Sequence, residues 1–303
     1  MNRSPWVKVA QTVFVVVVAV FFVRVASDNV SDLREVDLHL RPWRLLLALP
    51  VAVAIAPVLP LAWRQLVTAT RHDIEPRRAV GVWYVGQTAR YLPTGLVAFA
   101  SRALLAARFG VPQPVTVATV AVELGLIITT GGGLAAACLP SSELAGPLRV
   151  VIAAGAVAGL LVGPHLIRWA SGRIKQLDPH AAGGWSTIRL YEAEGLFLLN
   201  QVAKSLAFVL FVSALQPVRG GDVWLLIGAF NAANTLGTVG ITPAGLGVRE
   251  GVMAAILADR YGLGDGAAIA VAARVWDTAI ELIWLAIVQI SGFRAAPKGQ
   301  EPH

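Results

Sequence analysis

Residues 223–259 have the sequence VWLLIGAFNAANTLGTVGITPAGLGVREGVMAAILAD, which is mostly apolar but is interrupted by TPAGLG at 242–247. Proline and glycine end a helix and allow the chain to turn sharply. The pieces on either side have about 12 to 18 residues, or about 18 to 27 Å of helix, which is short for a membrane span. The segment therefore predicts a helical hairpin that enters and leaves a membrane on the same side.

A second segment, 79–108, is broken in the same way by LPTG at 92–95. Six longer apolar runs surround the two broken segments, at about 6–23, 43–67, 113–139, 148–170, 192–216 and 266–291. Runs of about 18 or more apolar residues are typical of membrane spans. Backbone groups in lipid must bond internally, and the runs lack the alternation of barrel strands, so we expect helices.

The composition supports a chain that lies mostly in lipid. Hydrophobic residues make up 56% and charged residues 14%, with a mean hydropathy of +0.67, whereas a soluble domain has about 25% charged residues. The first run is long enough to anchor, and the Val-Ala-Ser-Asp that follows at 25–28 is a poor cleavage site. We predict an all-α polytopic membrane protein, a single membrane domain over 1–303 with about six transmembrane helices and two re-entrant hairpins.

The basic residues indicate an orientation. The net charge is +7, which in a soluble protein would suggest nucleic acid. Here the basic residues sit mostly at the ends of apolar runs, thirteen on one side and seven on the other. This bias predicts a cytoplasmic-membrane protein with both termini in the cytoplasm, and no nucleic-acid partner. Four tryptophans near span ends, Trp6, Trp43, Trp63 and Trp169, are typical of an interfacial aromatic belt.

The two halves of the chain resemble each other. Pro93 falls opposite Pro243, and RFG at 108–110 falls opposite RYG at 260–262. We predict one repeat over about 6–139 and a second over about 148–291. Each has three crossings, so the second is inverted, an arrangement that transporters use. The alternative is a chance resemblance between two apolar halves.

One face of the second hairpin is polar, because Asn231, Asn234 and Thr238 recur at near-helical spacing. A new helix then begins after the glycine-rich break, and its free N–H groups and positive dipole end can bind an anion. Arg249 adds a planar fork suited to phosphate. The alternative is that the glycines only let two helices touch, while Arg249 only pairs with a nearby acid.

The first hairpin carries Gln87, Arg90 and Arg102. A charged residue at mid-membrane costs about 2.5–3.5 kcal/mol, so it usually faces a cavity or a partner. An arginine can otherwise extend its head group to the membrane surface. Both interpretations stay open for Arg90 and Arg102.

The spans contribute further charges to a predicted central cavity, namely Glu123, Glu194, Lys204, Arg274, Asp277 and Glu281. Arg274 and Asp277 can instead form a local ion pair within the last span. Glu123 lies opposite Arg274 at the repeat offset, which allows an ion pair between the repeats. Glu123 or Glu281 can also be a carboxylate that takes up and releases protons.

Several chemistries lack a motif in this sequence. The histidines and the single cysteine show no metal spacing, and there is neither a Walker loop nor a nucleophile elbow. No polar segment is long enough for a separate catalytic domain. We therefore expect no catalytic residue, no metal and no cofactor.

The motif TPAGLGVREG at 242–251 resembles the signature of the lysylphosphatidylglycerol synthase transmembrane region family. The matching positions are Pro243, Gly245, Gly247, Arg249 and Glu250, with Ala244 where glycine is common. The first hairpin keeps Pro93, Gly95 and Arg102 but lacks the family's acidic residue. The resemblance implies two re-entrant hairpins, a cavity between two repeats and movement of lipids between leaflets. Without the synthase domain, we expect no lysyl-lipid synthesis.

The leading hypothesis is a flippase-type transporter for an anionic, phosphate-bearing lipid, either a phospholipid or an isoprenoid-linked carrier. Arg249 and the glycine-rich helix start would hold the phosphate, and Arg90 or Arg102 would receive it. A second hypothesis is a small-anion transporter coupled to protons through Glu123, Asp277 or Glu281. A third is a non-catalytic membrane subunit for a glycosyltransferase or envelope-assembly partner. Spans rich in small residues also allow a homo-oligomer.

Overall fold

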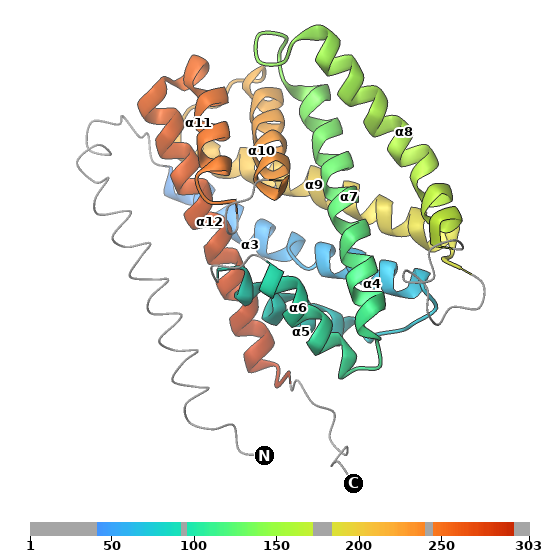
Figure 1. The fold of residues 1–303 in the computed structure, drawn as a ribbon. Helices are drawn as coiled ribbons and strands as arrows, with labels where there is room; N and C mark the ends of the chain where they lie inside the picture. Colours follow the sequence, from blue (N-terminus) through green and yellow to red (C-terminus); the bar gives the residue numbers. More distant parts are fainter. Residues whose placement is uncertain (1–40, 92–95, 172–183, 240–244, 294–303) are drawn as a thin grey trace.

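The computed structural model describes residues 41–91, 96–171, 184–239 and 245–293, and every regular element in them is a helix (Figure 1). The predicted all-α membrane fold is confirmed. The expected span 6–23 and both hairpin tips, at 92–95 and 240–244, lie outside the described residues.

The first half of the described chain begins with a broken helix and continues through the first hairpin. Its elements are α3 (Pro42–Ile55), α4 (Val58–Ala69), α5 (Pro76–Gln87), η1 (Thr88–Tyr91), α6 (Leu96–Ala107) and α7 (Gln113–Cys138). Helices α3, α5 and α7 have a proline in their first turn, where a missing N–H costs no hydrogen bond. Pro57 lies between α3 and α4, which together form one 28-residue segment.

The second half repeats the alternation of long and short helices. Its elements are α8 (Gly146–Ser171), α9 (Thr187–Leu215), α10 (Asp222–Val239), α11 (Val248–Tyr261) and α12 (Leu263–Ile290). Helix α9 begins five residues before the predicted span 192–216. Gly262, with a φ of 86°, separates α11 from α12.

Four segments are long and apolar enough to cross a membrane: Pro42–Ala69, Gln113–Cys138, Gly146–Ser171 and Thr187–Leu215. They agree with four of the six predicted spans. Even the shortest extends about 39 Å, more than the hydrocarbon core of about 30 Å. Helix α12 has 28 residues, but Arg274, Asp277 and Glu281 interrupt its apolar sequence.

Both broken segments divide into two short helices that contact each other, as predicted. Helices α5 and α6 have 12 residues each, and α10 and α11 have 18 and 14. None of the four exceeds about 27 Å in length. That the two hairpins re-enter on the same membrane side stays a prediction.

The long helix α12 links the two hairpins (Figure 1). Near one end it packs against α11, and toward the other it contacts α5. The segment α3–α4 packs against α9, and these helices run across the back of the view in Figure 1. Helix α8 lies at the outside against α7 and α9, and only 11% of its most apolar stretch is buried inside the protein. Its outer face is therefore available to lipid.

Stacked aromatic rings hold the second hairpin against its neighbours. Phe208 of α9 lies 5.1 Å from Phe230 of α10, and Phe211 of α9 lies 4.7 Å from Trp276 of α12, measured between ring centroids. Offset aromatic pairs add packing energy beyond the area they bury. These contacts fix the positions of α10 and α12 on which the charged residues described below depend.

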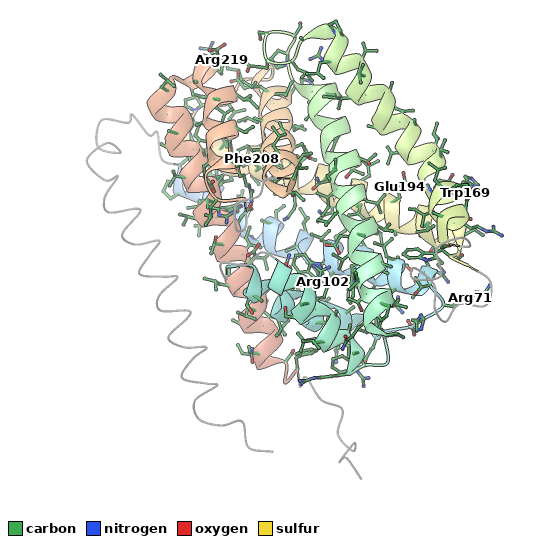
Figure 2. The ribbon with its side chains drawn as sticks, viewed as in Figure 1. Arg71, Arg102, Trp169, Glu194, Phe208 and Arg219 are labelled. Atoms are coloured by element: carbon green, nitrogen blue, oxygen red, sulfur yellow. The ribbon has the colours of Figure 1, made fainter. Side chains whose placement is uncertain are left out.

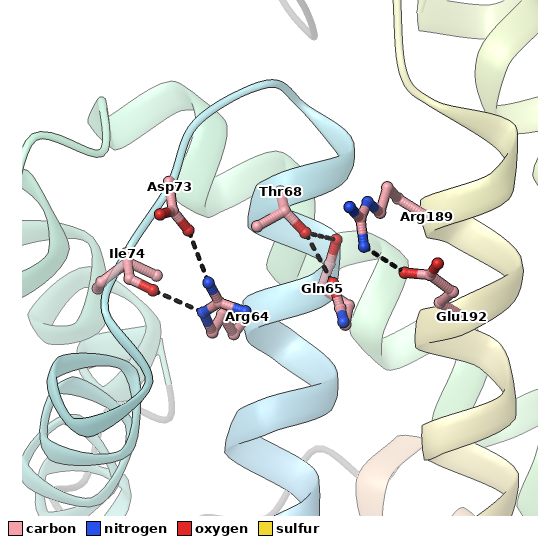
Figure 3. A network of polar contacts seen from close by, with 7 residues as sticks. All are labelled: Arg64, Gln65, Thr68, Asp73, Ile74, Arg189 and Glu192. Carbon is pink, nitrogen blue, oxygen red and sulfur yellow. Dashed lines mark hydrogen bonds and ion pairs between the residues drawn. The ribbon is translucent and has the colours of Figure 1, made fainter.

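A polar network closes the turn between α4 and α5 (Figure 3). The Arg64 guanidinium donates from Nε to the Ile74 carbonyl at 2.7 Å and from Nη2 to Asp73 at 2.8 Å. On α9, Arg189 pairs with Glu192 at 2.7 Å, and both side chains are exposed. Exposed ion pairs contribute at most about 1 kcal/mol, so this region shapes the turn more than it stabilises the fold.

Candidate functional site

The start of α11 is built on two glycines. Gly245 and Gly247 have φ values of 68° and 82°, a left-handed backbone that other residues rarely adopt. A Cβ on Gly245 would lie 2.7 Å from the Gly237 carbonyl oxygen of α10, so the two arms meet at bare backbone. The first helical hydrogen bond of α11 is Gly251 N to Gly247 O, which leaves the preceding N–H groups at the helix end.

Substituting these glycines separates backbone strain from crowding. We expect Gly247→Ala to lower the free energy of unfolding by about 1 kcal/mol, because its φ is unfavourable but the space around it is open. Gly245→Ala adds the clash with Gly237 and should cost about 2–3 kcal/mol. Thermal unfolding in detergent measures both, with Gly251→Ala, which lies in open helical space, as the control. Equal losses at 245 and 247 would show that the close approach is unimportant.

Two ion pairs join α11 to α12 beside this helix start. Arg249 Nη2 donates to an oxygen of Asp277, and Arg274 Nε lies 3.6 Å from Glu250 Oε1. The other oxygen of Glu250 accepts a hydrogen bond of 2.7 Å from the Gly247 N–H, which is the backbone half of a capping box. Arg274 and Asp277 therefore each have a partner on α11, in addition to their electrostatic interaction with each other within α12.

The cluster carries an excess of positive charge. Lys204 of α9 and Arg274 also act electrostatically on Asp277. Three cationic side chains, Arg249, Arg274 and Lys204, thus surround two carboxylates, Glu250 and Asp277. Counted over these five described residues, one positive charge is left over.

The cluster is partly open to its surroundings. The Arg249 and Asp277 side chains are 14% and 15% exposed, while Gly247 and Thr238 are exposed. The Arg249 guanidinium also lies 5.8 Å from the centre of the Phe230 ring, which favours a cation. The N–H groups of the helix start, an arginine fork and a net positive charge form an arrangement that can bind an anion.

The polar face of α10 divides between two environments. Asn231 is fully buried, and its Nδ2 donates to Ser205 Oγ of α9 at 2.7 Å and to the Ile227 carbonyl at 2.9 Å. Asn234 is half-buried and Thr238 exposed, and both bond to carbonyls of their own helix. Only Asn234 and Thr238 therefore lie on the side of the hairpin break, and Asn231 belongs to the interface with α9.

In the first hairpin, Arg102 is enclosed instead of reaching the membrane surface. It is 1% exposed and donates from Nη1 to Glu123 of α7. Its guanidinium lies 5.5 Å from the Trp63 ring centre and 5.4 Å from that of Trp83. Trp63 in turn donates to Thr119 Oγ1 at 3.2 Å. We call Arg102, Glu123, Trp63 and Trp83 the Arg102 box, which the sequence did not predict. The interfacial position expected for Trp63 is wrong, since the residue is wholly buried.

The two hairpins use the same pairing. In each, an arginine on the second arm bonds to an acid on the next long helix: Arg102 to Glu123, and Arg249 to Asp277. The suggested pair between Glu123 and Arg274 is wrong, because both have other partners. A constant repeat offset does not align these pairs, because the two arginines are 147 residues apart and the two acids 154.

The remaining predicted residues lie around these two centres. Gln87 ends α5 and is half-buried, and Arg90 lies in η1 with its side chain outside the described part. Glu281 of α12 acts electrostatically on Tyr84 of α5. Glu194 is buried in α9, and Figure 2 labels it together with Arg102.

These features define an integral membrane protein with two charged helical hairpins. The chain belongs to the family of the lysylphosphatidylglycerol synthase transmembrane region, whose model matches residues 9–287. The predicted family membership is thereby confirmed. This family is a membrane domain linked to lipid flipping. No curated protein and no solved structure matches the chain.

Proposed function

We propose that the protein moves an anionic, phosphate-bearing lipid across the cytoplasmic membrane. The observation that carries the proposal is the partly exposed cluster at the start of α11, with its one excess positive charge. A phosphodiester carries one negative charge and would neutralise it. The N–H groups of Val248, Arg249 and Glu250 and the Arg249 fork would bind the phosphate oxygens.

The arrangement of the hairpins supports transport across the membrane instead of binding alone. The first arm of each hairpin makes equivalent contacts with the other half and with its own half. Helix α10 contacts α7 of the first half, and α5 contacts α12 of the second half. Helix α10 also contacts α9, the helix before it, as α5 contacts α4. An inverted repeat has this property. We propose that the hairpins receive the head group from opposite leaflets, the enclosed Arg102 box being the closed side and the Arg249 cluster the open side.

Lipid tails would stay in the bilayer during this movement. The outer face of α8 is apolar and exposed, so hydrocarbon can lie against the protein without entering it. A small soluble anion would need a coupling group, and Glu123 and Asp277 are both engaged by arginines. These contacts favour the lipid over a small anion coupled to protons through Glu123 or Asp277. A glycosyltransferase or envelope-assembly partner and a homo-oligomer stay predictions.

Native mass spectrometry of the purified protein tests head-group binding. We expect wild type to retain a phosphate-bearing lipid and Arg249→Ala to lose it by at least tenfold, because a charge-assisted hydrogen bond contributes about 1.5–3 kcal/mol. Arg260→Ala is the matched control, since Arg260 lies on α11 but pairs with Asp222 at the far end of the hairpin. If all three proteins carried the same bulk lipids, the assignment of the head-group site would be wrong.

A further inference from the structure

Unpaired polar atoms gather where α9, α10 and α7 meet, and one more lies two helical turns away along α9. Glu194 Oε2, Gln201 Nε2, Asn231 Oδ1 and Thr235 Oγ1 have no hydrogen-bond partner among the described residues, and all four residues are more than nine-tenths buried. Buried polar atoms normally have partners, and leaving one unpaired costs about 1–3 kcal/mol. Three of these atoms, on Gln201, Asn231 and Thr235, belong to one interface and make it a polar region inside the protein.

Three of these residues converge on the backbone of α7. A Cβ on Gly131 would lie 2.9 Å from Gln201 Nε2 and still closer to Thr235 Oγ1, so only a bare backbone leaves room for both. Asn231 joins them through Ser205, whose Oγ donates to the Gln201 carbonyl at 2.6 Å. We call Glu194, Gln201, Ser205, Asn231 and Thr235 the polar track.

Glu194 lies at one end of this track. It is two helical turns before Gln201, on the same buried face of α9. Glu194 lies about 10 Å along α9 from the start of the helix. The exposed pair Arg189–Glu192 lies in the same first turns. A proton therefore has a short route from water to Glu194.

No cation neutralises Glu194 in the described part of the chain. The titratable and charged groups of α9 and of the helices that contact it are Arg44, Arg64, Glu123, Cys138, Arg149, His165, Arg168, Arg189, Tyr191, Glu192, Lys204, Asp222, Asp265, Arg274, Asp277 and Glu281. None of them pairs with Glu194, whereas Glu123 and Asp277 each bond to an arginine. An unpaired buried carboxylate is strongly disfavoured, so the protonated form suits this position.

The other end of the track leads to the anion-binding cluster. Thr235 lies about one turn before Thr238 and Val239 at the end of α10. Gly237, between them, lies against Arg249, since a Cβ there would be 3.2 Å from the arginine Cβ. Helix α10 therefore carries both Thr235 of the polar track and the glycine that contacts Arg249.

We propose that Glu194 is a proton-binding site and that the polar track couples its protonation to lipid movement. With its proton, Glu194 is neutral and stable in its buried position; it releases the proton only when water reaches this part of α9. The proton gradient would then supply the energy for transport. This inference rests on the proposed lipid transport, but proton binding at Glu194 is measurable without it.

Proteoliposomes with a fluorescent phosphatidylglycerol analogue measure the coupling, with a membrane-impermeant quencher reporting the outer leaflet. If one proton moves with each lipid, a gradient of about one pH unit shifts the distribution between leaflets by up to about tenfold. We expect this response in wild type and in the control Glu192→Gln, and its loss in Glu194→Gln, which keeps shape but binds no proton. A Glu194→Gln variant that still responds to the gradient would overturn the proposal, as would wild type moving lipid with no response.

Infrared difference spectroscopy of the purified protein tests proton binding itself. We expect a protonated-carboxyl band that titrates in wild type and in Glu192→Gln and is absent in Glu194→Gln. Identical titrations in all three proteins would refute proton binding at Glu194. If this band is found but wild type moves no lipid under any gradient, the proposed lipid transport fails and proton binding at Glu194 stands.

Discussion

Replacing Glu123 with alanine is expected to destabilise the protein by about 3–5 kcal/mol, because it leaves the Arg102 charge buried and unpaired. The Arg102 side chain is 2% exposed and is enclosed by Trp63 and Trp83. The guanidinium cannot reach water without moving α6 away from α7. Thermal or denaturant unfolding in detergent micelles measures the loss.

Two controls separate the buried charge from other effects of the substitution. Removing both partners, as in Arg102→Met with Glu123→Leu, should restore most of the stability, since no charge stays unpaired. Glu192→Ala breaks an exposed pair with Arg189 and should cost no more than about 1 kcal/mol. If Glu123→Ala were as mild as Glu192→Ala, Arg102 would have found water, and the enclosed box would be wrong.

The second large effect is expected on lipid translocation by variants of the Arg249–Asp277 pair. Arg249→Ala removes the fork and the excess positive charge, so transport of a phosphatidylglycerol analogue should fall at least tenfold. Asp277→Asn leaves Arg249 in place and raises the charge excess from one to two. It should therefore bind the anionic lipid at least as tightly as wild type, with slower release.

The two substitutions should change lipid binding in opposite directions, and this difference identifies the role of the pair. If Arg249 only held α11 against α12, both substitutions would break the same contact and impair binding alike. Native mass spectrometry measures lipid binding by each variant, and proteoliposomes measure its lipid transport. Equal losses in both variants would mean that the arginine is structural.

Much of the fold could be predicted because membrane spans follow from composition. The runs at 43–67, 113–139, 148–170 and 192–216 correspond to the four helical segments that can cross a membrane. The breaks in 79–108 and 223–259 also appear as divisions between short helices. Long apolar runs admit few structures in lipid, since the backbone must satisfy its own hydrogen bonds.

The site could be predicted less completely, because its contacts join distant segments. Sequence patterns selected Arg249, Glu250 and the glycines from the helix start that follows the break. They did not show that Arg249 bonds to Asp277 or that Arg102 bonds to Glu123. Side-chain pairing depends on how helices rotate against each other, and a run of apolar residues specifies a span without specifying its rotation.

Sequence alone determined that this chain is a helical membrane protein with two broken hairpins, since hydrophobicity and Pro/Gly breaks act locally. Only the tertiary structure decided which charges meet. It placed Arg102 between two tryptophans, left the Arg249 cluster with a surplus positive charge, and buried Glu194 with no cation partner among the described residues. Whether a charge in a membrane is neutralised, exposed or alone depends on neighbours far away in the sequence, and packing sets those neighbours.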